Sequence, residues 1–478
     1  MIWLWGLLGL FGLLAAVLVI RAAVFRPEAA PAVSQEAVDY DREGAMAALQ
    51  QLVQCRTVSH PDPQLEDEAE FQRLIDLMPR LYPTVFERCS FQQLPHRGVL
   101  MRWPGKHSDA PCVMMAHFDV VDVQQEQWDK PPFDGIIEDG VLWGRGTLDT
   151  KATFNGILWA AQTLMRQGFR PEQDLYFAFS GSEEINGDGA KEIVAQLRRS
   201  GVRPALVLDE GGAVVENVFP GVKSPCGLIG ISEKGMMNVR FRVRSQGGHA
   251  SAPGVRTPID ILSQGCLRLK QHPFPMRLCR PARELFDTLG RHSTFAYRLV
   301  FANLWLFRPA LDLLCRKQGG EMNALVRTTT AFTQMEGSSG RNVLPPSAWM
   351  ISNLRLVPGD TVEQTRRRLI RTVKDPAIEV EVLESFEPSP VSDSHCEAYD
   401  RVAAAVRATW PGCIVSPYLM VQCADARHYG ELSDHVYRFC AMELTAEERK
   451  TIHGNNERIR LEAIGKTVEF YIRLMKQC

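Results

Sequence analysis

The chain has 478 residues, with 54 lysines and arginines against 56 aspartates and glutamates, and its net charge is −2. This balance excludes a basic surface spread over the whole protein, so we do not expect nucleic acid as a partner. Apolar residues make up 45% of the chain and charged residues 23%, a globular composition that excludes general disorder. The length predicts two or three folded units. The twelve cysteines are scattered without a CxxC pair, which argues against a disulfide framework and a zinc ribbon.

The chain begins with a long apolar segment. Residues 2–20 contain no charged side chain, and a helix of this length spans roughly 28 Å, about the thickness of a bilayer core. Tryptophans lie near one end of this run, where interfacial indole rings are common. We therefore expect residues 1–26 to form a single-pass transmembrane anchor and residues 27–42 a polar linker.

A cleavable signal peptide is the competing interpretation of the same segment, and it would make the protein secreted. Signal peptides usually carry a basic start and a shorter apolar core, and neither is present here. The Ala22–Ala23 pair nevertheless leaves cleavage open. Arg21 and Arg26 follow the apolar run and favour a cytoplasmic body by the positive-inside tendency.

Residues 43–232 alternate amphipathic segments with short apolar runs. Helices are expected at residues 43–55, 66–77, 151–167 and 190–200. Buried strands are expected at residues 112–116, 175–180 and 205–208. This alternation predicts an α/β fold in which helices flank a mixed sheet.

The pattern changes after residue 232. Residues 238–245 alternate apolar side chains with arginines, which predicts a strand with one wet face. The elements that follow are a helix at 257–269, strands within 325–334 and 349–356, a helix at 361–373 and a strand at 377–383. Strand, helix, two strands, helix, strand is the ferredoxin-like order. We therefore expect an inserted α/β domain over residues 233–385. Residues 386–478, with helices at 397–409 and 462–476, complete the first domain.

An additional helical stretch, residues 271–320, interrupts the inserted domain. Residues 294–314 are apolar enough to need a partner, but their charges argue against a membrane span. One interpretation is a helix pair packed on the inserted domain. The alternatives are a channel for a long acyl chain or a contact with the bilayer near the anchor, which substitution of Phe301, Trp305 or Phe307 would test.

Acids and a histidine follow the three predicted strands. The side chains concerned are His117 and Asp119, Glu183 and Glu184, and Asp209 and Glu210. A glycine-containing loop delivers one more acid, Asp149, to the start of a helix. Ligands of open α/β sheets bind at the carboxyl ends of the strands, so these segments are expected to converge. Imidazole and carboxylate together predict a metal site.

Six motifs give the chain a family resemblance. They are His117-Phe-Asp119, Gly144-Arg-Gly-x-x-Asp149-x-Lys151, Ser182-Glu183-Glu184, Leu208-Asp209-Glu210-Gly211-Gly212, Gly247-Gly248-His249-Ala-Ser251 and His453-Gly-Asn-Asn-Glu457. Over residues 45–475 the chain resembles the acetylornithine deacetylase/aminoacylase/carboxypeptidase family of two-zinc hydrolases. It is most similar to the carboxypeptidase S and N-fatty-acyl-amino-acid hydrolase branch, which also has a membrane or secretory N-terminus, Asp in the third ligand motif and an enlarged inserted domain.

The resemblance implies a zinc exopeptidase-like catalytic domain that holds two zinc ions per subunit. Asp149 would bridge the ions, His117 and Asp209 would complete one site, and Glu184 and His453 the other. Glu183 would be the general base, and Asp119 would orient His117. The substrate would be an N-acyl amino acid or a short peptide, cleaved at an amide bond next to a free α-carboxylate.

The resemblance also implies roles for the inserted domain, as a lid and as the contact of a homodimer. His249 would reach the active site of the neighbouring subunit and stabilise the oxyanion. Asn342 and Arg355 match positions that contact substrate in relatives, and a guanidinium suits a carboxylate. Arg427 is a further candidate for the same carboxylate.

Three functional interpretations stay open at this point. N-acyl-amino-acid hydrolysis and carboxypeptidase or dipeptidase cleavage are close rivals, and the sequence does not say whether condensation also occurs. A non-catalytic binding or receptor protein on the same scaffold is disfavoured, since the implied ligands and the base are all present.

Overall fold

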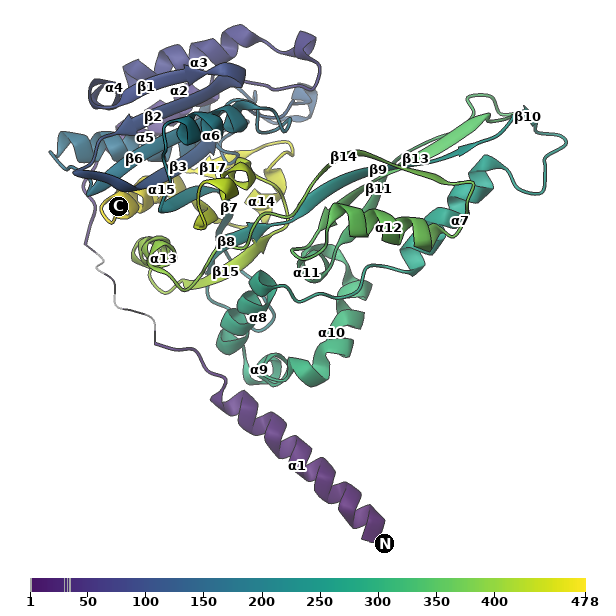
Figure 1. Ribbon diagram of the computed structural model, residues 1–478. Coiled ribbons are helices and arrows are strands. Elements are labelled where there is room, and N and C mark those ends of the chain that lie inside the picture. The colour runs from purple at the N-terminus through teal and green to yellow at the C-terminus, as the bar shows by residue number, and fades with distance from the viewer. Residues whose placement is uncertain (1, 30, 32, 34–35) are drawn as a thin grey trace.

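The computed structural model describes residues 2–29, 31, 33 and 36–478. A mixed eight-stranded sheet forms the centre of the larger unit, with strand order β1-β2-β6-β3-β7-β16-β8-β15 (Figure 1). These strands are β1 (Ser90–Leu94), β2 (Gly98–Trp103), β3 (His107–His117), β6 (Gln173–Ser180), β7 (Leu206–Val215), β8 (Cys226–Glu233), β15 (Ile414–Met420) and β16 (Val436–Leu444). Because β3 is parallel to both β6 and β7, the carboxyl ends of these three strands meet at one edge.

Helices cover both faces of this sheet. One face and its apolar core are covered by α2 (Arg42–Val53), α3 (Glu68–Leu81), α4 (Pro83–Arg88), α5 (Lys151–Arg166), α13 (Glu397–Thr409) and α15 (Leu461–Met475). The other face carries α6 (Gly189–Arg199) and the 3-10 helix η4 (Asp425–Glu431). Helix α5 is buried from Lys151 to Met165, which fixes its first turn at the edge of the sheet where the strands end.

A small three-stranded sheet brings the C-terminal segment to the same edge. Its strands are β4 (Ile136–Glu138), β5 (Val141–Trp143) and β17 (Arg458–Arg460), in the order β17-β5-β4. The loop after β5 therefore lies beside the segment that precedes β17. The remaining short helices of this unit are η1 (Pro63–Leu65), η2 (Pro95–Arg97), η3 (Gln125–Gln127) and α14 (Ala446–Thr451).

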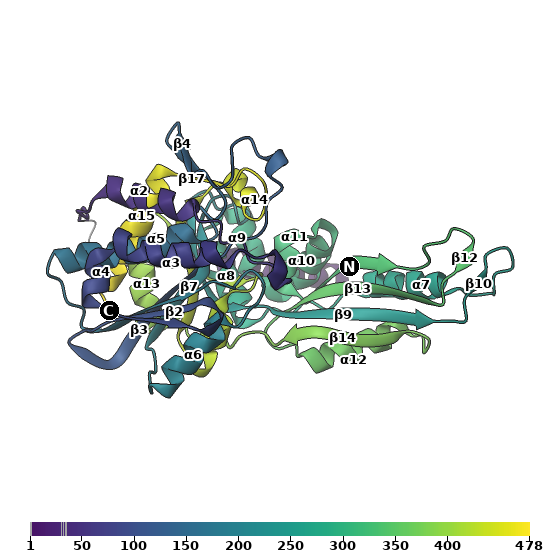
Figure 2. The ribbon, with the colours of Figure 1, turned by 90° about the horizontal axis from the view of Figure 1, so that it is seen from above.

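The smaller unit is a four-stranded antiparallel sheet that extends away from the larger unit (Figures 1 and 2). Its strands β9 (Gly235–Arg244), β11 (Thr329–Glu336), β13 (Ser347–Leu356) and β14 (Glu379–Phe386) lie in the order β11-β13-β9-β14. Helices α7 (Pro258–Gln271) and α12 (Val362–Val373) pack against it around a separate apolar core. At the far tip, β10 (Gly248–His249) pairs with β12 (Val343–Leu344).

The α/β architecture and the separate small sheet agree with the sequence-based expectation, including the strand–helix–two strands–helix–strand order. Strands β1, β2, β8, β15 and β16 were not among the expected elements. The edge strand β1 is polar and largely exposed, so it shows no apolar run. Strand β16 pairs with β7, far away in sequence, and no local pattern reveals such a pairing.

The additional helical stretch forms α8 (Arg280–His292), α9 (Phe295–Phe301), α10 (Leu304–Gln318) and α11 (Gly320–Val326). One interpretation of this stretch was a helix pair packed on the inserted domain, but α8 and α9 pack on the large sheet. Helices α8 and α9 share an apolar core with β8 and β15 of the large sheet, and Phe219 packs against both Phe286 and Phe301. The chain thus returns to the larger unit before it completes the smaller one.

The expected apolar helix is present at the N-terminus as α1 (Ile2–Val24), which projects away from the body (Figure 1). Among the described residues, the stretch Trp3–Val24 alone is long and apolar enough to cross a membrane, a property that signal sequences share. The expected linker over residues 27–42 falls partly on residues 30, 32, 34 and 35, which lie outside the described residues.

Candidate metal centre and active site

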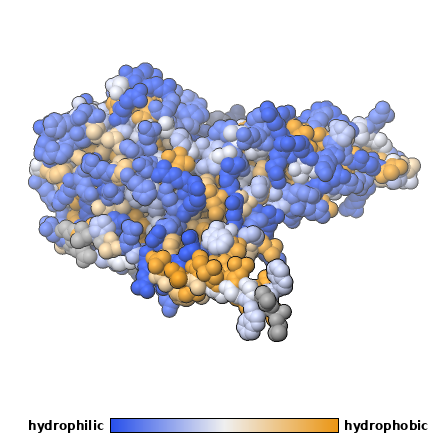
Figure 3. All heavy atoms as spheres, turned by 60° about the horizontal axis from the view of Figure 1, so that its bottom comes forward, coloured by the Kyte–Doolittle hydropathy of each residue, from blue (hydrophilic) through white to orange (hydrophobic). Residues whose placement is uncertain are grey.

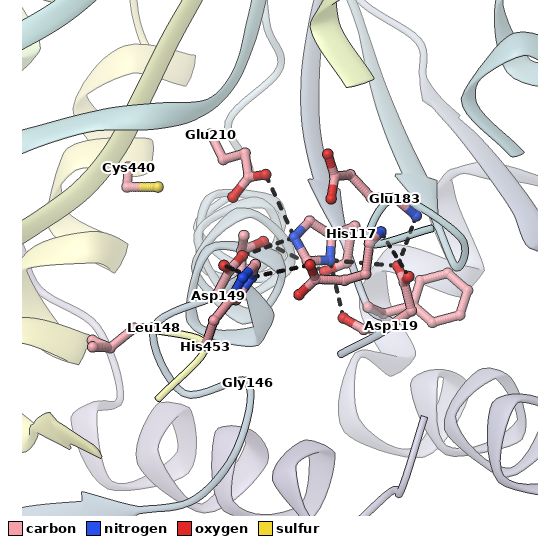
Figure 4. A network of polar contacts seen from close by, with 12 residues as sticks. His117, Asp119, Gly146, Leu148, Asp149, Glu183, Glu210, Cys440 and His453 are labelled. Carbon is pink, nitrogen blue, oxygen red and sulfur yellow. Dashed lines mark hydrogen bonds and ion pairs between the residues drawn. The ribbon is translucent and has the colours of Figure 1, made fainter. Parts of the chain in front are cut away.

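His117 ends β3 and carries the first imidazole of the site. Its Nε2 lies 2.9 Å from Asp149 Oδ1, and its Nδ1 lies 3.0 Å from the backbone oxygen of Asp119 and 3.4 Å from the Asp119 carboxylate (Figure 4). The side chains of His117 and Asp119 are both buried. Asp119 thus contacts the ring from the side opposite to Asp149, which is the geometry that fixes the orientation and tautomer of a metal-binding histidine.

Asp119 also holds the next loop. Its carboxylate accepts hydrogen bonds from the backbone N–H groups of Glu183 (3.1 Å) and Glu184 (3.1 Å) and from the hydroxyl of Ser59 (2.7 Å). The two glutamates follow β6, so one buried carboxylate ties the ends of β3 and β6 together. These hydrogen bonds fix the backbone positions from which the side chains of Glu183 and Glu184 extend.

Asp149 lies in the loop between β5 and α5, and the Asp149–Thr150 peptide bond is cis. The loop is held by Glu457, which sequence reasoning cited as part of a motif without giving it a role. Its carboxylate accepts hydrogen bonds from the backbone N–H groups of Leu148 (2.7 Å) and Asp149 (3.2 Å) and from the guanidinium of Arg145 (2.6 Å). The Glu457 carboxylate thus joins the loop that carries Asp149 to the segment before β17. Neither segment on its own reveals this contact.

His453 supplies the second imidazole, from the segment before β17. Its Nε2 lies 3.0 Å from Asp149 Oδ2 and 3.0 Å from Glu184 Oε2. His117 and His453 thus lie on the two oxygens of one carboxylate, that of Asp149. This is the arrangement that a carboxylate bridging two cations needs.

Glu210, and not Asp209, faces this cluster. Glu210 Oε1 lies 3.5 Å from His117 Nε2, whereas the Asp209 carboxylate accepts a hydrogen bond from the backbone N–H of Ala426 (2.7 Å) in η4. The expected strand ended at residue 208, but β7 continues to Val215, and neighbouring residues of a strand point to opposite faces. Glu210 therefore lies beside His117, while the expected ligand Asp209 contacts the backbone of η4.

The donor atoms lie close enough together to hold metal. Ligand atoms of His117, Asp149 and Glu184 lie within 4.8 Å of one another, as do those of His117, Glu183 and Glu210. Imidazole nitrogens and carboxylate oxygens so close together are a donor set that suits a divalent metal such as zinc.

The pKa values of the clustered acids also indicate a cation site. Burial, reinforced by neighbouring acids, raises the pKa of Glu184 to about 7 and that of Glu210 to about 8. Burial also raises the pKa of Glu183 well above its ordinary value. Although burial opposes it, hydrogen bonds from both histidines hold the pKa of Asp149 below its ordinary value. When they are ionised, carboxylates at such close range repel one another. Cations bound between them would remove this electrostatic repulsion.

A cavity of about 440 Å³ opens beside the cluster. The acids Asp149, Glu183, Glu184 and Glu210 and the imidazole of His453 line one side of it. The rest of the lining is largely apolar and includes Ala213, Val215, Leu228, Tyr418, Met420, Met442, Leu444 and Ile452, together with the polar side chains of Glu321, Gln422 and Arg449. The cavity therefore joins a polar reaction site to an apolar compartment.

One of the two arginines expected to bind substrate, Arg355, contacts a residue that lines this cavity, whereas Arg427 lines a different hollow, beside Lys191 and Val194. Arg355, at the end of β13, contacts Cys423 Sγ at 2.8 Å, and Cys423 lines the cavity. Arg427 donates to the backbone oxygen of Ala424 (2.7 Å) and to Asn186 Oδ1 (3.2 Å), and its side chain is largely buried.

The structure does not bring His249 and Asn342 to the cluster of their own chain. His249 is exposed in β10 at the far tip of the smaller unit, where the Asn342 backbone oxygen accepts a hydrogen bond from Ala250 (2.9 Å) (Figure 2). A role for either residue in catalysis thus requires a second subunit.

Comparison with known proteins places the chain among metal-dependent hydrolases. The model of Peptidase family M20/M25/M40 matches residues 113–477. The chain is 35% identical over 447 residues to N-fatty-acyl-amino acid synthase/hydrolase PM20D1 of Xenopus tropicalis, covering 92% of this chain and 87% of that protein. It is 32% identical over 415 residues to probable carboxypeptidase S-like 2 of Dictyostelium discoideum, covering 86% and 80%.

A solved structure shares the fold. The M20 family metallo-carboxypeptidase Sso-CP2 from Sulfolobus solfataricus superposes with a TM-score of 0.68, covering 90% of this chain and 98% of that one, at 16% identity. The family model and the relatives at 32–35% identity confirm the family resemblance that the sequence motifs indicated.

Proposed function

Because the chain belongs to peptidase family M20/M25/M40, an enzyme family of metallopeptidases and amidohydrolases, we propose that it hydrolyses N-acyl amino acids with long apolar acyl chains. The observation that carries this proposal is the cavity beside the metal centre, with its acidic side and its apolar side. Among the relatives, PM20D1 is named an N-fatty-acyl-amino acid synthase/hydrolase.

The proposed cofactor is a pair of zinc ions, one on His117 and Glu210 and the other on His453 and Glu184, with Asp149 between them. Bound cations of this kind lower the pKa of a water molecule and polarise an amide carbonyl. Support comes from the two imidazoles on the two oxygens of Asp149.

Glu183 is the proposed general base. It lines the cavity, and its backbone is fixed by Asp119. A carboxylate held there could take a proton and return it to the leaving nitrogen. Among the described residues, Asp149 and Glu210 form ion pairs with His117 and Glu184 forms one with His453, whereas Glu183 forms none with either imidazole.

The substrate would lie with its two ends in different environments. The free α-carboxylate would contact the guanidinium of Arg355, with Arg427 as a further partner, since a planar guanidinium binds carboxylate through two hydrogen bonds. The acyl chain would extend along Leu228, Met420 and Met442. Each methylene group buried there contributes about 0.8 kcal/mol.

We further propose that α1 is a permanent anchor. Its last turns pack on the folded body: Ala22 is 0% exposed, and the side chain of Asn303 donates to the backbone oxygen of Leu18 (3.1 Å). Cleavage next to Ala22 would remove a part of the chain that the body contacts.

A dimer is also proposed, in which the tip with His249 and Asn342 reaches the site of a second copy. The exposure of His249 and its distance from its own cluster in Figures 1 and 2 support this arrangement. A mixture of Glu183→Gln and His249→Ala chains tests it. Mixed dimers should regain part of the activity that each variant lacks alone.

The substrate proposal is tested by the rates on a panel of N-acyl glycines of increasing chain length and on dipeptides, with zinc-loaded full-length protein. We expect kcat/KM to rise about fourfold per methylene until the apolar compartment is filled. The variant Met442→Gln should flatten this dependence without changing the rate on the N-acetyl substrate. Faster cleavage of dipeptides than of all N-acyl substrates would instead support the carboxypeptidase interpretation.

A further inference from the structure

The base of α1 is not free of the folded body. The guanidinium of Arg21 donates to the backbone oxygen of Ala302 (3.1 and 2.9 Å) at the end of α9, and that of Arg291 lies 4.6 Å above the Phe25 ring. These contacts place α9 beside the point where α1 leaves the body. The orientation of α1 therefore determines which surface of the body faces the membrane.

Helix α10 turns an apolar face outward. Trp305, Pro309 and Leu313 lie four residues apart, a spacing that puts them on one side of a helix, and all three are exposed. Together with neighbouring exposed side chains they form a patch that we call the α9–α10 patch: Phe295, Tyr297, Trp305, Leu306, Leu313 and Leu314. Figure 3 shows the apolar residues of α1 as a band along the lower side of the molecule, in front of the body that it adjoins.

This pattern is the reverse of that expected for a helix in contact with water. Surface helices of globular proteins turn their polar face outward, and large exposed apolar patches mark a binding surface. Trp305 is 59% exposed and Leu313 55% exposed, although Leu311 and Cys315 on the other side of the helix are buried. The outward side thus lacks a partner within the described part of the chain.

We propose that the α9–α10 patch lies in the headgroup region of the bilayer that α1 spans, so that the enzyme rests on the membrane surface. A span of 22 residues, Trp3–Val24, is about 33 Å long, so the bilayer surface falls at the base of α1, at the level of α9. Aromatic side chains favour this interfacial region, and α9 and α10 also carry the basic residues Arg298, Arg316 and Lys317, of the kind that contact lipid phosphates.

The inference depends on the proposed anchor but not on the proposed substrate. It is tested on the full-length chain in vesicles of phosphatidylcholine and phosphatidylserine, with a photo-crosslinking amino acid at a single position. Positions 305 and 313 probe the patch. Phe11 in α1, 72% exposed, is the positive control, and Leu65, 66% exposed in η1 of the larger unit, is the matched negative control.

Mass spectrometry of the irradiated protein should show lipid adducts at positions 11, 305 and 313 and none at position 65. Lipid adducts at position 11 alone would leave the anchor intact and overturn the inference. Crosslinks from 305 and 313 to a second copy of the chain would overturn it too, since they would make the patch a subunit interface. Intact mass identifies the remaining case, loss of α1 by cleavage, which contradicts the anchor and the inference together.

Discussion

The carboxylate of Glu457 lies 2.6 Å from the guanidinium of Arg145, and both side chains are buried. The same carboxylate accepts hydrogen bonds from the backbone of the loop that carries Asp149. Glu457 comes four residues after His453, so this ion pair fixes the positions of the bridging carboxylate and of one imidazole relative to each other. A contact outside the metal cluster thus determines the geometry inside it.

Glu457→Gln should destabilise the zinc-free protein by about 3–5 kcal/mol, because it leaves the buried Arg145 cation without a counter-charge. The measurement is urea unfolding in the presence of a chelator. The double variant Arg145→Met/Glu457→Gln removes both charges and should recover part of the loss. A single variant no less stable than the double variant would contradict the assigned role.

Glu210→Gln should lower the bound metal from two ions to about one per chain, because Glu210 faces His117. Asp209→Asn should retain both ions, since that carboxylate contacts the backbone of Ala426. Metal content after dialysis against a weak chelator measures the difference. The reverse result would restore Asp209 as the ligand and show that β7 is turned the other way.

Glu183→Gln should keep both metal ions and lose catalysis by about 10²–10⁴-fold, the contribution of a positioned general base. The amide keeps the shape of the side chain but cannot take a proton. Steady-state kinetics together with metal analysis distinguish this outcome from loss of the site. Near-normal turnover in this variant would remove Glu183 from the mechanism.

Arg355→Gln should lower kcat/KM by roughly 10–150-fold, equivalent to about 1.5–3 kcal/mol for a lost hydrogen bond to a charged group. The loss should be confined to substrates that carry a free carboxylate. The matched control is the corresponding N-acyl amino amide, whose slow cleavage should be unchanged by the substitution. Equal losses on both substrates would mean that Arg355 acts on the fold and not on the carboxylate.

The zinc-free protein should lose stability as the pH rises from 5 to 8. Burial raises the pKa of Glu184 from 4.5 to about 7 and that of Glu210 from 4.5 to about 8, so between these values the folded state holds protons that the unfolded chain has released. For each such proton, the free energy of unfolding falls by about 1.4 kcal/mol per unit of rise in pH. Hydrogen bonds to Asp149 and Glu184 raise the pKa of His453 to about 10. Above pH 6.5 this shift also lowers the stability of the folded state as the pH rises. The effect is smaller than that of the two glutamates, because solvent screens this half-exposed ring.

Calorimetry with and without zinc measures this dependence. Zinc needs the deprotonated ligands, so the gain in Tm on adding zinc should grow with pH over the same range. A Tm of the zinc-free protein that rises between pH 5 and 8 would mean that these carboxylates are ionised in the folded state without metal.

Much of the fold and most of the site follow from the sequence. Apolar runs and amphipathic segments predicted the α/β class, and the acids directly after three of these runs predicted one cluster at one sheet edge. His117, Asp149 and Glu184 do lie together there, and His453, which only the family resemblance implied, joins them. This works because strand ends and helix starts are local features, and a parallel sheet brings equivalent ends to the same side.

The tertiary structure decided what local patterns do not contain. The choice between Asp209 and Glu210 depends on how far β7 continues, because each further residue of a strand reverses the side chain's direction. The contact between Glu457 and Arg145 joins segments far apart in the chain. The position of α8–α10 on the large sheet and at the base of α1 likewise depends on which apolar faces meet, and a sequence states only that such faces exist.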